Sequence, residues 1–166
     1  MIAGLITPSG NLGALTPQTI SVKPITDVAV EVGDIVQFDL TASTSPRALA
    51  ANLTNFDEKT CPFNVVKKGV AVVAGSEGGI WGVVTEAAAA GNRCTVVVAG
   101  VVDAKVTTAG ATAAGAVLMA VAAAVLGPAT SGNNPAIAVL LEAANTVTAA
   151  SRKVLFNGYA IGSSAG

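Results

Sequence analysis

The sequence predicts an all-β fold: a small β-barrel, β-tulip-like or sandwich domain with an extended N-terminal arm. Apolar runs of strand length alternate with turns rich in Gly, Pro and Asn along most of the chain. A strand-turn-strand unit occurs twice. The sequence has no long amphipathic helical pattern, so we expect the apolar runs to close into a barrel or to pack as a sandwich.

The duplicated unit is marked by the tripeptide Glu-Ala-Ala at the end of an apolar run. Residues 81–88 read WGVVTEAA, and residues 137–144 read IAVLLEAA. A second apolar run that closes on glycine follows each copy, at residues 94–100 and 153–158. The parallel order of these segments predicts two related elements of the fold.

The chain is expected to divide into an N-terminal arm, residues 1–27, and a single β domain, residues 28–166. The repeat units occupy approximately residues 80–100 and 136–158 of that domain. A looser match lies upstream of the units, because residues 33–38 and 115–120 are both apolar runs that open on glycine.

The arm is punctuated by Pro8, Pro17 and Pro24, which remove backbone donors and disfavour helix. Its apolar residues need a partner, and two arrangements are open. The arm either packs along its own domain or adds a strand to a neighbouring subunit. The candidate contact residues for a partner are Leu5, Ile6, Leu12, Leu15, Ile20, Val22 and Ile25.

Within the domain, the apolar runs and their flanking turns place the strands in order. A polar loop is expected at residues 41–62, turns at residues 75–79 and 90–92, and a long loop at residues 127–135. Residues 120–126 are compatible with strand or loop, because alanine favours helix while the flanking pattern favours strand. The predicted strands cover residues 28–40, 63–67, 69–74, 80–85, 95–98, 101–106, 116–121, 136–141 and 153–156.

The composition indicates a surface that is partly covered in an assembly. Charged residues make up 11% of the chain, against about 25% in ordinary soluble domains, while 52% of residues are hydrophobic. A monomer with so few charges would expose much apolar surface, so an oligomer or a lattice is expected to cover it. The alternative is a surface made of Ala, Thr, Ser and Gly.

Charge and hydropathy argue against nucleic acid and membrane as partners. The net charge is −1, and the basic residues form only doublets, whereas phosphate binding needs several converging Lys or Arg side chains. The N-terminus lacks the basic region of a signal peptide, and the longest apolar run, residues 113–126, is shorter than a membrane-spanning helix. The expected location is the cytosol or a particle assembled there.

No catalytic, metal-binding or cofactor-binding residue is predicted. The chain contains no histidine, and Cys61 and Cys94 cannot form a tetrahedral metal site alone. They are expected to be buried or half-buried thiols in a reducing compartment, with a disulfide as the alternative. Glu86 and Glu142 occupy equivalent repeat positions and could form a carboxylate pair, but carboxylates at strand ends more commonly satisfy backbone donors. The chain is therefore not expected to be an enzyme.

The two Glu-Ala-Ala strands, the valine-rich strands after them and the glycine-led run at residue 33 resemble the capsid decoration, or cement, proteins of tailed bacteriophages. The resemblance covers about residues 28–160, and the long loop at residues 41–62 departs from it. It implies a small β-barrel or β-tulip protein, often a homotrimer. It also implies binding to the exterior of an assembled head, where the protein clamps neighbouring major capsid subunits and lays its arm on the capsid.

Two other roles stay open at this point. The first is another virion or surface structural protein, such as a fibre or spike head. The second is a carbohydrate-binding module, for which the sequence offers few aromatic residues to stack on a sugar.

Overall fold

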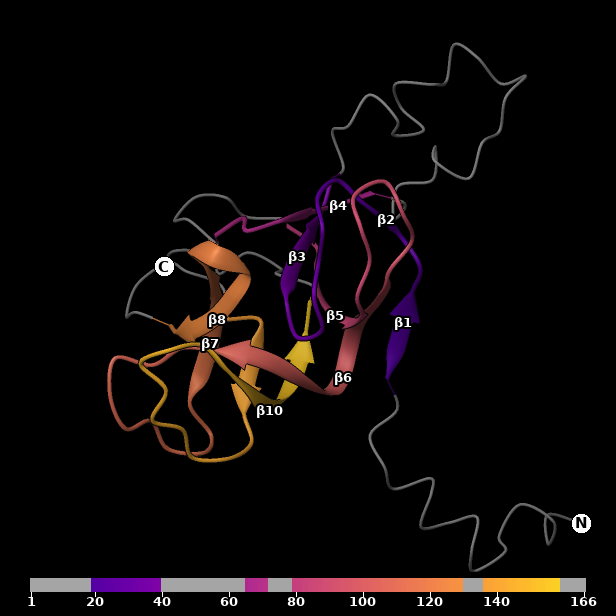
Figure 1. Cartoon of the computed structure of the whole chain (residues 1–166). Helices are drawn as coiled ribbons and strands as arrows, with labels where there is room; N and C mark the ends of the chain where they lie inside the picture. The colour runs from indigo at the N-terminus through magenta and orange to yellow at the C-terminus, as the bar shows by residue number, and fades with distance from the viewer. Residues whose placement is uncertain (1–18, 40–64, 72–78, 130–135, 159–166) are drawn as a thin grey trace, which may run out of the picture.

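The computed structural model describes residues 19–39, 65–71, 79–129 and 136–158 (Figure 1). Four predicted arm contacts, Leu5, Ile6, Leu12 and Leu15, lie outside these residues, as do Cys61 and the whole predicted loop at 41–62. The strands are β1 (Ile20–Val22), β2 (Ile25–Thr26), β3 (Ile35–Phe38), β4 (Val65–Lys68), β5 (Trp81–Glu86), β6 (Thr95–Val106), β7 (Val117–Val121), β8 (Val125–Pro128), β9 (Ala138–Leu140) and β10 (Ala150–Asn157).

The second half of the chain forms a closed ring of five strands, which we call the C-terminal barrel. β10 pairs with β9, β9 with β7, β7 with β8, and β8 with the end of β6; β6 then pairs with β10 and closes the ring. All these pairs are antiparallel except β6 with β8. The predicted all-β barrel is confirmed.

The first half forms a matching ring, which we call the N-terminal barrel. The first part of β6 pairs with β5, β5 with β3, and β3 with β4. β4 pairs with β2, and β1 pairs with β6, so β1 and β2 together close the ring. Pro24 separates β1 from β2, since proline offers no backbone N–H to a ladder.

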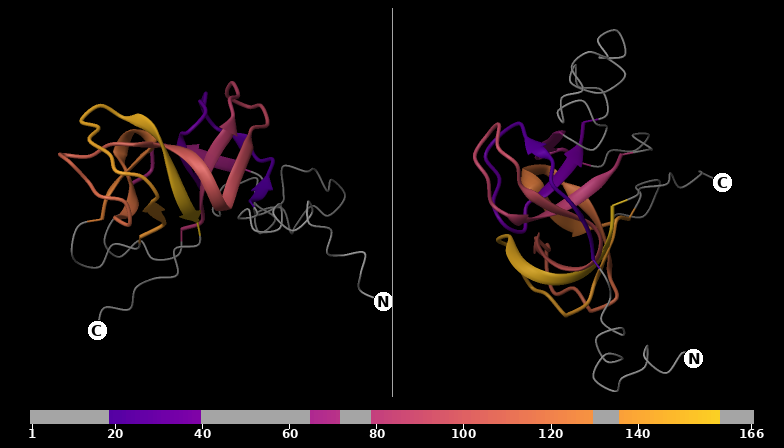
Figure 2. Two further views of the ribbon diagram at one scale, coloured as in Figure 1. Left: turned by 90° about the horizontal axis from the view of Figure 1, so that it is seen from below. Right: turned by 90° about the vertical axis from the view of Figure 1, so that its right-hand side faces the viewer.

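Strand β6 belongs to both barrels. Its beginning pairs with β1 and β5, while the part from Ala99 to Val106 pairs with β10. Figures 1 and 2 show the result as two lobes with β6 running between them. The sequence pattern predicts two shorter strands here, residues 95–98 and 101–106, separated near Gly100. The strand continues through this glycine because its partner Phe156 lies opposite it.

The predicted repeat is confirmed by the strand register. In the N-terminal barrel Val83 pairs with Val97, and in the C-terminal barrel Val139 pairs with Leu155. Both copies of Glu-Ala-Ala then make the same contact. Ala88 forms a two-hydrogen-bond bridge with Val30, and Ala144 forms one with Thr112.

The looser upstream match has the same structural basis. Gly33 and Gly115 both have positive φ, at 86° and 89°, a conformation that glycine adopts without strain. Gly33 donates its N–H to the carbonyl of Val84 at 2.8 Å, and Gly115 donates to Leu140 at 2.7 Å. β3 with β4 therefore corresponds to β7 with β8, and the whole barrel is duplicated, not only the hairpin.

Each barrel contributes its own apolar interior, but the two clusters differ in extent. The N-terminal barrel is filled by residues such as Val36, Val84 and Val96. The cluster of the C-terminal barrel also includes residues from the outside of the first barrel, namely Ile35, Trp81, Val83 and Val97. The two barrels thus share one buried contact.

Several strands differ from their predicted extents. Residues 127–128, predicted as loop, belong to β8, where Gly127 is buried and lies opposite Met119. Residues 69–71 lie outside any strand, and the rest of the strand predicted at 69–74 lies outside the described residues. β10 begins at Ala150 because the long edge of β6 extends its ladder.

Exchanging Ala123 for glycine is expected to stabilise the fold. Ala123 is exposed and has φ 68° in the tight turn between β7 and β8. A residue with a Cβ in the left-handed conformation destabilises the folded state by about 1–2 kcal/mol, and glycine removes this cost. Glycine also increases the entropy of the unfolded chain, which lowers stability by about 0.5–1 kcal/mol, so the net gain in stability is about 0.5 kcal/mol. Urea unfolding measures it. Ala90→Gly, at an exposed turn residue without positive φ, should instead lose stability; equal shifts in both variants would contradict the argument.

Candidate interaction surfaces and the barrel junction

An ion-pair cluster around one buried carboxylate joins three segments where the barrels meet. The carboxylate of Asp34, whose side chain is 2% exposed, accepts from Lys68 Nζ and from Lys105 Nζ, both at 2.7 Å. It also accepts the backbone N–H of Glu31 at 2.8 Å. Glu31 binds Lys105 in turn at 2.6 Å. Because Lys105 lies in the second half of β6, the cluster connects the start of β3 to both barrels.

The electrostatics of the cluster favour its charged form. Burial raises the pKa of Asp34, but the hydrogen bonds from Lys105 and Lys68 outweigh it, and the net pKa lies below its ordinary value. Burial lowers the pKa of Lys105, and its bonds to Asp34 and Glu31 outweigh that effect, so the net pKa is raised. The cluster is a structural joint whose charged groups are paired with one another.

A second joint lies at the end of β10. Trp81 donates its backbone N–H to the carbonyl of Gly158, and Gly158 donates its own N–H to Val98, both at 2.8 Å. A Cβ at Gly158 would collide with the backbone of Trp81. Glycine is therefore required here by close approach of two strands.

The repeated glutamates are each held within their own hairpin. Glu86 accepts the Thr95 hydroxyl at 2.6 Å, and Glu142 accepts the backbone N–H of Lys153 at 3.0 Å. Both side chains thus satisfy donors on the next strand, which is the structural role that the sequence analysis favoured over a catalytic pair.

Other candidate chemical groups have ordinary structural surroundings. Cys94 is a buried free thiol, and burial raises its pKa to about 11. The described residues contain no group of three or more potential metal ligands. In the same part of the chain, no helix has the length and apolar character needed to cross a membrane.

The outside of the C-terminal barrel carries an apolar row across four strands. Val117, Val139, Leu155 and Val101 lie side by side in register on β7, β9, β10 and β6. Val117 and Leu155 are 49% and 45% exposed, and the other two are half-buried. We call these four residues the C-terminal outer row.

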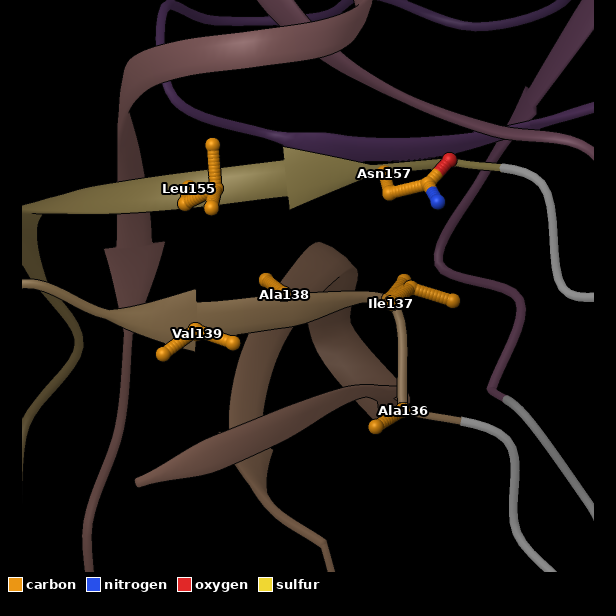
Figure 3. Close-up of a pocket in the computed structure, with 6 residues that line it drawn as sticks. All are labelled: Ala136, Ile137, Ala138, Val139, Leu155 and Asn157. Carbon is orange, nitrogen blue, oxygen red and sulfur yellow. The ribbon is translucent and has the colours of Figure 1, made fainter. Parts of the chain in front are cut away.

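A shallow hollow of about 140 Å³ adjoins this row (Figure 3). Val139 and Leu155 line one part of it, and Ile137 and Asn157 line another. On the other side of the row, Lys153 and Asp103 form an exposed ion pair at 3.1 Å. The row is therefore bordered by a mainly apolar hollow on one side and by an exposed ion pair on the other.

The three arm residues that the structure describes belong to the N-terminal barrel. Ile20 and Val22 lie in β1 and Ile25 in β2, so this part of the arm pairs with strands of its own chain. Ile20 nevertheless leaves 57% of its surface exposed, and Val22 and Ile25 are not fully covered. Whether the arm also contacts a partner stays a prediction.

The sequence analysis missed the Asp34 cluster and the C-terminal outer row. A signal for the cluster was present, because Asp34 follows Gly33 in the first repeat while Ala116 follows Gly115 in the second. A charged residue in one copy of an otherwise apolar match marks a position with a different neighbourhood. The row could not be found from the sequence alone, since it requires knowing which faces of the strands are inside.

Comparison with known proteins identifies the fold. No protein-family model matches the chain, and no curated protein matches its sequence. Among solved structures, it is similar to the N base of the head fiber gp8.5 of bacteriophage phi29, with a TM-score of 0.51. The match covers 86% of this chain and 98% of that one, at 8% identity. At this identity the likeness establishes a shared fold.

Proposed function

We propose that this protein is a non-enzymatic structural component of a bacteriophage virion. It binds the exterior of the assembled head as a homotrimer and stabilises it by clamping neighbouring major capsid subunits. The observation that carries the proposal is the fold shared with a phage head-fiber base over most of both chains. The low charge of the sequence and the exposed apolar row support a protein whose work is to bury surface on a larger assembly.

The stabilisation follows from linkage. A protein that binds only the assembled shell shifts the equilibrium away from disassembly, and several contacts made by one oligomer add avidity. We therefore expect heads of the phage that carries this protein to melt at a higher temperature with the protein bound. Differential scanning calorimetry of decorated and bare heads measures the shift, with occupancy checked by gel densitometry. Identical melting at full occupancy would refute stabilisation.

Deleting residues 1–18 is expected to leave the barrels folded and to weaken head binding at least about tenfold, because apolar arm residues would lose their contacts on the shell. The truncation must stop before β1, since a chain starting at residue 27 would lose both strands that close the N-terminal barrel. Co-sedimentation with bare heads measures binding, and circular dichroism checks the fold. Unchanged binding by the folded truncation would eliminate the arm's role.

The comparison also favours a second candidate, the base of a fibre on the head. Both roles place the protein on a virion, but a fibre base carries a projecting structure and a cement protein forms a low layer. Cryo-electron microscopy of virions with and without the protein separates the two. The carbohydrate-binding alternative gains no support from the described residues, where the aromatic side chains Phe38, Trp81 and Phe156 are all buried.

A further inference from the structure

The duplicated barrel gives every surface of one barrel a counterpart on the other. The counterparts of Val117, Val139 and Leu155 are Ile35, Val83 and Val97, which occupy the same places in the ladders of β3, β5 and β6. We call these three residues the N-terminal outer row.

The two rows differ sharply in burial. The N-terminal outer row is 0–5% exposed and belongs to the same buried cluster as the core of the C-terminal barrel. Within one chain, therefore, a barrel of this fold covers the outer row of its twin. The C-terminal outer row remains apolar but has no such cover among the described residues, although a solvent-facing sheet surface normally alternates to polar residues.

The intramolecular contact also shows which part of a barrel approaches the row. The carbonyl of Gly33, next to the N-terminal outer row, accepts the N–H of Lys105 at 2.8 Å, and a Cβ there would touch Ala104 and Lys105. The corresponding Gly115, next to the C-terminal outer row, has no atom within 4 Å of such a Cβ. In the part of the chain that the structure describes, no strand occupies the corresponding place beside the second barrel.

The counterpart of that approaching strand is β1 with β2. Thr26 pairs with Val66 as Val106 pairs with Leu126, so the segment before Thr26 corresponds to the second half of β6. By this register Ala104 and Lys105 correspond to Pro24, which is buried, and Ile25, which is half-buried. Ile20, at the beginning of the same segment, is more than half exposed. Each chain therefore carries two exposed surfaces that could fit together. One is the C-terminal outer row, and the other is the β1–β2 segment, which corresponds to the part of β6 that covers the N-terminal outer row.

We propose that the C-terminal outer row of one chain binds the β1–β2 segment of a second copy, in a head-to-tail contact that repeats the junction inside the chain. The proposal rests on the self-association included in the proposed function and names its surfaces. The occupant is a second copy because the chain already shows a barrel of this fold covering the equivalent row. A contact between two different surfaces produces a ring if it closes and a chain if it does not.

Sedimentation equilibrium of the full-length protein tests the proposal without phage heads. The wild type is expected to exceed the mass of one 16.1 kDa chain. Leu155→Lys and Ile20→Lys, one in each surface, are each expected to weaken association on the order of a hundredfold, since each would bury an unpaired charge in an apolar contact. Val147→Lys, at a residue 78% exposed and outside both surfaces, is the control and should associate like the wild type.

Mixing the two variants distinguishes a head-to-tail contact from a face-to-face contact. Each variant keeps one intact surface, so the mixture should form a heterodimer and nothing larger. Circular dichroism and the fluorescence of the single tryptophan verify that each variant is folded. A monomeric wild type, a folded Leu155→Lys variant that associates normally, or a mixture that stays monomeric would overturn the proposal. If the protein did not bind phage heads but still associated as described, the proposed function would be wrong and the head-to-tail contact would be unaffected.

Discussion

Replacing Asp34 with alanine is expected to lower the free energy of unfolding by about 3 kcal/mol. Its carboxylate is buried and holds two lysines and a backbone N–H, and removal of one partner from a buried pair typically costs about 3–5 kcal/mol. The lower value applies because the lysine side chains keep part of their contact with water. The corresponding fall in melting temperature is about 6–12 °C.

The matched control is Asp103→Ala, which removes the exposed ion pair with Lys153. Exposed pairs contribute about 0–1 kcal/mol, so this variant should melt close to the wild type. Urea titrations followed by tryptophan fluorescence measure both. If both variants lost a similar free energy of unfolding, the buried Asp34 carboxylate would contribute no more stability than the exposed pair.

The same site predicts how stability depends on pH. The pKa of Asp34 is depressed in the folded state, so its contribution is complete above its unfolded value of about 4 and is lost as the pH falls through the folded pKa. Asp34→Ala should therefore differ most from the wild type above about pH 5, and the two curves should converge in acid. A difference that grows as the pH falls would contradict this assignment.

Replacing Gly158 with alanine is expected to cost about 3 kcal/mol or more. The new Cβ would overlap the backbone of Trp81, so the end of β10 must move away and lose its hydrogen bonds to Trp81 and Val98. The single tryptophan, buried in the native protein, reports the movement directly. We expect its emission to shift to the red even before unfolding.

Gly110→Ala is the control for the glycine substitution. A Cβ at Gly110 meets open space, and its φ is not positive, so the change should stay within about 0.5 kcal/mol of the wild type. An unshifted spectrum and unchanged stability for Gly158→Ala would mean that the junction between β5 and β10 is not tightly packed.

The sequence allowed prediction of the fold class and the repeat because both depend on local patterns. Glu-Ala-Ala marks the end of a hairpin strand in both copies, and the glycines at 33 and 115 mark the same turn. β1 and β2 were assigned to an arm, because Pro17 and Pro24 weaken the strand pattern. Their pairing with β6 and β4 depends on residues far along the chain.

The candidate surfaces were harder to predict, for a similar reason. Leu155 lies between Val154 and Phe156 in a continuous apolar run, and only the closed ring shows that Leu155 points outward. The Asp34 cluster unites three segments that are separated by more than thirty residues each, so no local spacing reveals it. Long-range contacts therefore determined what the sequence analysis missed.

The strand shared by the two barrels has a consequence for synthesis on the ribosome. The N-terminal barrel has all its strands once Ala99 has emerged, but its outer row is not fully covered until the chain reaches Gly158. At typical elongation rates of about 5–20 residues per second, this interval lasts about 3–12 s. During this interval Ile35, Val83 and Val97 form an incompletely covered apolar surface on the nascent chain, so the barrel is then exposed to aggregation or to chaperone binding.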